Sequence, residues 1–204
     1  MHGQWKSGER LAPVVDPFTG KLIAQVTQAT ESDVDEAIAS TCSAATAMGQ
    51  LPAHARYNML QQIAALLYRR RDEVAQTITA EAGKPITDAK REVSRAIQTF
   101  TVAAEEARRI PGEIVPLDWT PGFDTHLGML RRFPIGPILG ITPFNFPLNL
   151  VAHKVAPALA AGNTVVIKPS EQTPLTTLLL ARVAAEIFPK GVLNVITGRG
   201  ATVG

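Results

Sequence analysis

Residues 134–204 alternate short apolar runs with helical segments, and this alternation constrains the fold more than any other feature of the sequence. The apolar runs predict strands at 138–141, 164–167 and 192–196. Pro147 and Pro174 precede the two intervening segments, and proline is favoured in the first turn of a helix. This order is typical of a parallel sheet with right-handed crossovers. Such sheets bind ligands at the carboxyl ends of their strands, so the residues that follow each predicted strand are candidates for a site.

The preceding part of the chain is richer in charged residues and predicts solvated helices. After a short strand–turn opening, Thr30 and Asp33 resemble a capping box that begins a helix. Pro52 suits the start of a second helix, and Gly83-Lys84-Pro85 suits the end of a third. Apolar spacing over 93–107 indicates a fourth helix. Apolar runs on both sides of Thr120-Pro121-Gly122 predict a hairpin-like excursion.

The overall charge argues against nucleic acid or an anionic membrane as a partner. The chain has 20 Lys and Arg against 18 Asp and Glu, a formal net charge of +2. The longest uncharged stretch, 133–153, contains prolines that would interrupt a membrane-spanning helix. Cys42 is the single cysteine and the first residues lack the apolar core of a signal peptide, so we expect a cytoplasmic protein. The scattered histidines predict no metal site, and Cys42 is interpreted as a packing or surface thiol.

The first predicted strand end carries an asparagine between two prolines. It reads Thr142-Pro143-Phe144-Asn145-Phe146-Pro147, and the prolines restrict the backbone around Asn145. The amide of Asn145 offers uncharged N–H donors, which suit stabilisation of a developing oxyanion. An asparagine ahead of a helix also commonly satisfies backbone groups, and on the amide alone this structural role is the commoner one.

The second and third strand ends carry features of a nucleotide site. Lys168 is a fixed positive charge able to hold a phosphate or ribose oxygen, and the carboxylate of Glu171 is able to accept both ribose hydroxyls. A solvated loop in which Ser170 caps the next helix explains these residues at least as well. The third strand end reads Gly198-Arg199-Gly200-Ala201-Thr202-Val203-Gly204, and this segment follows the strand as a phosphate loop does. The motif is weak, because Val203 departs from the standard fingerprint and no helix is expected after it, so a plain turn is the simpler interpretation.

Two long runs, 138–147 and 156–171, occur in this order along the chain. Glu81-Ala82-Gly83-Lys84-Pro85 and Gly191-Val192-Leu193-Asn194-Val195 accompany them. Together these segments closely resemble the aldehyde dehydrogenase superfamily. The resemblance implies an α/β fold with an incomplete Rossmann-like parallel sheet, preceded by a helical layer and an oligomerisation hairpin. The implied parts are the helical layer over 1–112, the hairpin over 113–133 and the first βαβαβ part over 134–204, with the catalytic domain absent.

The same resemblance implies an oxidoreductase that uses NAD(P)+ to convert an aldehyde to a carboxylic acid through a cysteine thiohemiacetal. Asn145 matches the catalytic asparagine whose side-chain amide donates to the oxyanion. The implied cofactor-binding residues are Ile141, Thr142, Pro143, Phe144, Asn145, Lys168, Ser170, Glu171, Gly200 and Gly204. Phe144 replaces the family's more frequent Trp. NAD is the expected cofactor and NADP the alternative, because the Glu171 carboxylate repels a ribose 2′-phosphate.

The resemblance also bears on substrate and assembly. Residues 131–171 resemble relatives that act on small polar or acidic aldehydes, such as lactaldehyde, succinate semialdehyde or glyceraldehyde 3-phosphate. A complete protein of this kind is expected to be a homo-oligomer, either a dimer or a tetramer. The family's nucleophilic Cys and general-base Glu have no counterparts here, and Cys42 aligns with a surface helix, so we expect these 204 residues to be inactive alone.

Two alternatives from other functional classes remain open. The chain could be a truncated, non-catalytic relative that acts as a binding or oligomer-interfering protein through the 113–133 hairpin. It could also be a nucleotide-binding module of another α/β family, which the ordered motifs favour less.

Overall fold

A computed structural model describes residues 3–204, and its parallel sheet has the alternation of strands and helices expected from the sequence. The sheet order is β5–β6–β7, with β5 (Pro137–Ile141), β6 (Thr164–Lys168) and β7 (Leu193–Val195). The crossover helices are α5 (Asn149–Ala160) and α6 (Leu175–Ala185). The central strand β6 is buried along its whole length, as its continuous apolar run predicts. The expected α/β class is confirmed.

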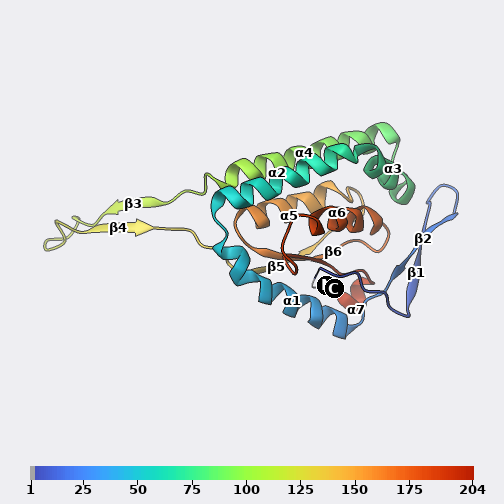
Figure 1. The fold of residues 1–204 in the computed structure, drawn as a ribbon, viewed down its shortest axis with the longest axis horizontal. Helices are drawn as coiled ribbons and strands as arrows, with labels where there is room; N and C mark the ends of the chain where they lie inside the picture. Colours follow the sequence, from blue (N-terminus) through green and yellow to red (C-terminus); the bar gives the residue numbers. More distant parts are fainter. Residues whose placement is uncertain (1–2) are drawn as a thin grey trace.

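Helices cover both faces of this sheet (Figure 1). Helix α1 (Glu31–Gln50) packs on one face, and α5 and α6 pack on the other. An outer helical layer covers α5 and α6, and it consists of α2 (Ala53–Arg69), α3 (Arg71–Ala82) and α4 (Ile86–Ala107). Fully buried Leu60, Phe100, Leu159 and Ile167 join the layers in one hydrophobic core. Over the described part of the chain, no helix is long and apolar enough to cross a membrane.

Local sequence signals explain where the outer helices begin and end. Thr30 and Asp33 form both hydrogen bonds of the predicted capping box at the start of α1. Gly83 ends α3 in the left-handed conformation, with φ of +66°. A Cβ at this position would lie 2.8 Å from Cγ of Pro17, so both the conformation and the space require glycine. The chain then turns directly through Lys84 and Pro85 into α4.

Two helix boundaries differ from the sequence expectations. Pro147 lies ahead of the first turn of α5, which begins at Asn149, whereas Pro174 directly precedes α6. The interpretation of residues 198–204 as a plain turn is wrong, because the short helix α7 (Gly200–Val203) lies within this segment. Val203 folds back against Gly198, where a Cβ would lie 2.9 Å from Cγ2 of Val203, and this close approach allows the extra turn.

Two antiparallel hairpins extend from the layered body (Figure 1). Strands β1 (Leu11–Val15) and β2 (Leu22–Thr27) form the first hairpin, and β3 (Glu113–Pro116) and β4 (Leu127–Leu130) form the second. In the first, the Asp16 carboxylate accepts hydrogen bonds from the backbone N–H groups of Phe18 and Thr19, at 2.8 and 2.9 Å. The second projects away from the helices, so its side chains have few neighbours within the chain.

Candidate functional site

The carboxyl ends of β5, β6 and β7 meet at one edge of the sheet. Ile141 is the partner of Lys168 in the β5–β6 register, and the backbone N–H of Thr142 donates to the Lys168 carbonyl at 3.1 Å. On the other side of β6, the N–H of Ile196 donates to the carbonyl of Ile167 at 2.9 Å. The sheet therefore brings the candidate residues of the first two strand ends next to each other.

The segment 142–148 connects β5 to α5 and is called the Asn145 loop below. Asn145 is exposed on this loop, and the apolar side chains of Ile141 and Phe144 beside it are more than half exposed. The backbone carbonyl of Asn145 accepts a hydrogen bond from Nζ of Lys84 at 2.9 Å. The loop thus presents an uncharged amide and an apolar surface to an approaching ligand, while its backbone is tied to the protein body.

Two charged side chains of the outer layer hold the Asn145 loop, and sequence reasoning identified neither as a site residue. Lys84 forms an ion pair with Glu92, whose side chain is 1% exposed. Oε1 of Glu92 accepts hydrogen bonds from the backbone N–H groups of Leu148 and Asn149, at 2.9 and 3.1 Å. The sequence does contain a signal for Glu92: it is a carboxylate at a position that faces the core of an amphipathic helix. A carboxylate is buried only where it is paired or hydrogen-bonded, so this position indicates a specific partner.

Lys168 ends β6 as a buried cation, with 6% of the residue exposed. Among the described residues, its Nζ hydrogen-bonds only the Pro169 carbonyl oxygen, at 3.2 Å. A buried ammonium carries three donors, so this one has capacity for further acceptors. Phosphate or ribose oxygens fit that capacity, and the donor chemistry at this strand end therefore suits a nucleotide cofactor.

Ser170 and Glu171 lie at a small cleft that joins the second and third strand ends. They line it together with Thr197 and Gly198, and its volume is about 10 Å³. Gly200 and Gly204 are exposed at the two ends of α7 and are not among the residues that line this cleft. Within residues 3–204, no three His, Cys, Asp or Glu side chains are grouped to hold a metal ion. The single thiol, Cys42, is exposed on α1.

A larger cavity of about 540 Å³ lies between α4 and α5. Its polar lining includes Arg95 of α4 and Asn149 and His153 of α5. The amide oxygen Oδ1 of Asn149 is buried and, in the described part of the chain, has no hydrogen-bond partner. The Arg95 guanidinium lies 5.6 Å from the ring centroid of Phe146, so the cavity adjoins the Asn145 loop. A mostly apolar hollow with a few polar groups, next to an exposed amide, is typical of a small-molecule site.

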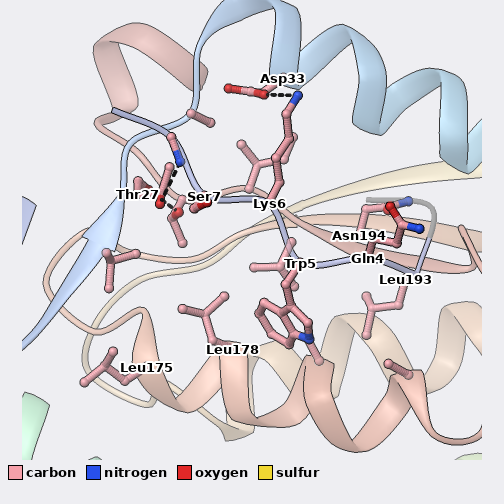
Figure 2. A pocket seen from close by; sticks show the side chains of 18 of the residues that line it. Gln4, Trp5, Lys6, Ser7, Thr27, Asp33, Leu175, Leu178, Leu193 and Asn194 are labelled. Carbon is pink, nitrogen blue, oxygen red and sulfur yellow. Dashed lines mark hydrogen bonds and ion pairs between the residues drawn. The ribbon is translucent and has the colours of Figure 1, made fainter. Parts of the chain in front are cut away.

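Figure 2 shows another cavity, of about 330 Å³, beneath the amino-terminal segment. Trp5 points toward α6 in this view, and Lys6 reaches Asp33 across an ion pair of 2.7 Å. The hydrogen bond from Lys6 lowers the pKa of Asp33 to about 2. None of the predicted site residues lines this cavity. Its walls come from β7 and the residues after it, from α6 and from the amino-terminal segment.

Comparison with known proteins identifies the family of this chain. The family model described as "Aldehyde dehydrogenase family" matches residues 5–204. The 3-sulfolactaldehyde dehydrogenase of Priestia aryabhattai is 41% identical over 205 residues, which cover all of this chain and 43% of that protein. The lactaldehyde dehydrogenase of Methanococcus aeolicus is 36% identical, again over all of this chain and 43% of that protein. The chain therefore spans less than half the length of these relatives.

Solved structures give the same result for the fold. The crystal structure of aldehyde dehydrogenase 21 from Physcomitrella patens, in complex with succinate, has a TM-score of 0.95 and 42% identity over 98% of this chain and 42% of that one. The NADP-dependent glyceraldehyde-3-phosphate dehydrogenase of Bacillus halodurans, complexed with NADP, has a TM-score of 0.96 and 33% identity over 100% of this chain and 44% of that one. These values bear out the Rossmann-like assignment of the sheet. The chain belongs to the aldehyde dehydrogenase family.

Proposed function

We propose that this chain forms the cofactor-binding and oxyanion-stabilising part of an enzyme that oxidises a small aldehyde to a carboxylic acid. The observation that carries the proposal is the placement of Asn145, exposed beyond the carboxyl end of β5 on a loop whose Phe146 ring lies 5.6 Å from Arg95 of the cavity between α4 and α5. An amide held there donates an N–H to an oxygen that gains negative charge when a nucleophile adds to the aldehyde carbon. The attacking thiol and the general base belong, in this proposal, to segments beyond these 204 residues.

The proposed cofactor site follows the edge of the sheet. Lys168 and Ser170 hold the ribose hydroxyls next to Glu171, and the exposed Ile141–Phe144 segment supports the reactive end of the cofactor. Gly200 and Gly204 let the α7 backbone approach the cofactor closely. When bound, NAD(P)+ supplies the hydride acceptor of the oxidation. The buried ammonium of Lys168 supports this assignment, because it makes one hydrogen bond within the described residues and has donors left for the cofactor.

Glu171 favours NAD+ over NADP+ in this arrangement, because its carboxylate repels a 2′-phosphate. Lys168 acts in the opposite direction, so the preference is modest. Two similar proteins were solved with NADP, and the betaine aldehyde dehydrogenase of Staphylococcus aureus was solved with NAD+. In the complete enzyme, Glu171→Gln is expected to bring the kcat/KM values of the two cofactors closer together. An unchanged ratio would contradict the role of Glu171.

The cavity between α4 and α5 is the proposed place of the aldehyde. Arg95 and His153 line it as partners for an anionic or hydroxyl-bearing substrate. Similar proteins act on lactaldehyde, 3-sulfolactaldehyde and succinate semialdehyde, which are small polar or acidic compounds. A small polar or acidic aldehyde is therefore the proposed substrate class.

Replacement of Asn145 tests its proposed role in stabilising the oxyanion. In the complete enzyme, Asn145→Ala removes the N–H donors and is expected to lower kcat by about a hundredfold or more, because the loss falls on the charged transition state. Steady-state kinetics with a saturating aldehyde measure this change, with cofactor affinity as the control. A kcat close to that of the unaltered enzyme would overturn the oxyanion role.

A second proposal concerns assembly, and the β3–β4 hairpin supports it. Ile114, Leu127 and Met129 on this hairpin are each at least two-thirds exposed, although all three are large apolar side chains. Such side chains on a projecting hairpin suit burial against a second copy of the chain. This contact serves either a homo-oligomeric enzyme or a non-catalytic chain that interferes with a full-length relative. Light scattering of a Leu127→Glu/Met129→Glu variant should show a smaller assembly, and an unchanged mass would contradict the proposal.

A further inference from the structure

Lys84 lies between the end of α3 and the start of α4, and its side chain reaches the Asn145 loop. Gly83 before it ends α3 in the left-handed conformation, and Pro85 after it leads directly into α4. The Lys84 side chain is 15% exposed, so it is held within the protein rather than free in solvent. Its Nζ donates to the Asn145 carbonyl at 2.9 Å and lies 4.1 Å from the centroid of the Phe146 ring. One ammonium group therefore contacts two consecutive residues of the loop.

Glu92 holds the other end of the same loop. Its Oε1 accepts the N–H groups of Leu148 and Asn149, and its Oε2 pairs with Lys84. The carboxylate satisfies N–H groups at the start of α5 that have no acceptor within the helix. A single ion pair consequently ties down the loop at Asn145 and again at the residues that begin the helix.

The remaining ties of the loop lie elsewhere. The Thr142 N–H donates to the Lys168 carbonyl, the Leu150 N–H donates to the Phe146 carbonyl at 3.1 Å, and the Thr177 hydroxyl donates to the Pro147 carbonyl at 3.5 Å. None of these three hydrogen bonds involves an atom of Asn145. The carbonyl carbon and Cβ of a residue are bonded to the same Cα, so a hydrogen bond that fixes the carbonyl restricts the direction in which the side chain leaves the backbone.

We propose that Lys84 and Glu92 are positioning residues that aim the Asn145 amide at the reacting oxygen. This inference rests on the oxyanion role proposed above for Asn145. Donors stabilise an oxyanion only when they are already oriented, and a shift of about 1 Å costs on the order of a hundredfold in rate. Lys84 touches neither substrate nor cofactor in this scheme and acts through the loop that carries Asn145.

The kinetic test compares single and double variants of the complete enzyme. Lys84→Met keeps an unbranched side chain that is one atom shorter and removes the charge and the donors, and kcat should fall roughly tenfold to a hundredfold with little change in the KM for the cofactor. Lys84→Arg keeps the positive charge and should recover part of the loss. Lys90→Met is the matched control, because Lys90 is exposed on α4 and, within residues 3–204, its ammonium pairs only with Asp72, at 3.2 Å; its kcat should stay unchanged.

The double variant Asn145→Ala/Lys84→Met separates this inference from the proposed function. If Lys84 acts through Asn145, adding Lys84→Met to Asn145→Ala lowers kcat no further. A multiplied loss, or an unchanged kcat in Lys84→Met alone, would overturn the positioning role. A near-normal kcat in Asn145→Ala would instead remove the proposed function on which it rests.

Hydrogen exchange of the 204-residue chain supplies a readout that does not depend on activity. Lys84→Met should speed exchange of the backbone amides of Leu148 and Asn149 at least tenfold, while the amide of Thr176 at the start of α6 stays as protected as before. Equal acceleration at both helices would indicate general loss of stability and contradict a local role. If Lys84→Met does not fold, the same comparison in Lys84→Arg, with its smaller expected change, decides the matter.

Discussion

The amino termini of α5 and α6 are held in the same way but in different electrostatic surroundings. Each receives a buried carboxylate from the outer helical layer. Glu92 accepts the N–H groups that begin α5, whereas Glu81 accepts those of Leu175 and Thr176 that begin α6, at 2.7 and 2.9 Å. Glu92 also has Lys84 as its counter-ion. Glu81 receives the Thr176 hydroxyl instead, and no ion pair to it occurs among the described residues.

The pKa of Glu81 reflects this difference. Burial raises it from the ordinary 4.5 to about 7, although the hydrogen bonds from Thr176 and Leu175 act in the opposite direction. Nearby Glu92 adds a smaller upward effect. The same capping geometry therefore supports a charged pair at one helix and a largely uncompensated carboxyl group at the other. The charged pair is the one at the loop that carries Asn145, where the position of the backbone matters most for the proposed chemistry.

The largest expected effect is the loss of Glu92. Glu92→Leu leaves the partly buried ammonium of Lys84 without its ion-pair partner and two backbone N–H groups without an acceptor, so the free energy of unfolding at pH 7 should fall by about 4 kcal/mol. Glu81→Leu leaves two N–H groups unpaired but strands no cation, and its loss should be about 2 kcal/mol. Urea denaturation of the 204-residue variants measures both. Equal losses would show that the counter-ion contributes nothing.

A pH titration of stability should show an effect of intermediate size. The folded-state pKa of Glu81 is raised, so its favourable contribution is fully present below about pH 4.5 and is lost as the pH rises through about 7. The shift corresponds to about 3 kcal/mol. Relative to Glu81→Gln, which cannot ionise, the unaltered chain should lose about this amount between pH 4.5 and 8.

The control for this titration is Glu73→Gln on the same helix, where the side chain is 53% exposed and pairs with Arg70. Its stability should follow that of the unaltered chain across the whole pH range. If Glu81→Gln shows the same pH dependence as the unaltered chain, Glu81 is not the group that titrates near neutrality.

The strands and most helix boundaries followed from local sequence signals, whereas the two carboxylate contacts did not. The Thr30–Asp33 capping box and the Gly83 helix end depend on residues a few positions apart, and both are present. Glu92 meets partners 56 and 57 positions away, and Glu81 meets partners 94 and 95 positions away. Contacts of this range depend on how the outer layer packs against α5 and α6, which periodicity within one helix does not specify.

Some features of the candidate site also followed from local sequence signals, whereas others depend on tertiary packing. The sequence places Lys168 and Asn145 correctly at strand ends, because strand order and apolar runs determine those positions. Their chemical roles stay predictions. The cavity between α4 and α5 could not be inferred, since Arg95 and His153 lie on different helices and meet only through tertiary packing. The short α7 was missed because four residues carry too little periodic signal.

The smallest expected effect concerns the hydroxyl that Glu81 has in place of a cation. Thr176→Val keeps the shape of the side chain but removes the donor to the Glu81 carboxyl group, so stability should fall by about 1 kcal/mol at pH 5 and somewhat more at pH 8, where the acceptor is charged. Because this hydrogen bond lowers the pKa of Glu81, its loss should also move the midpoint of the pH-dependent stability above 7. Thr177→Val is the matched control, since the Thr177 hydroxyl donates to the Pro147 carbonyl and not to Glu81. If both variants leave the midpoint unchanged, the hydroxyl does not moderate the charge on Glu81, and burial alone distinguishes the α6 cap from the ion pair at α5.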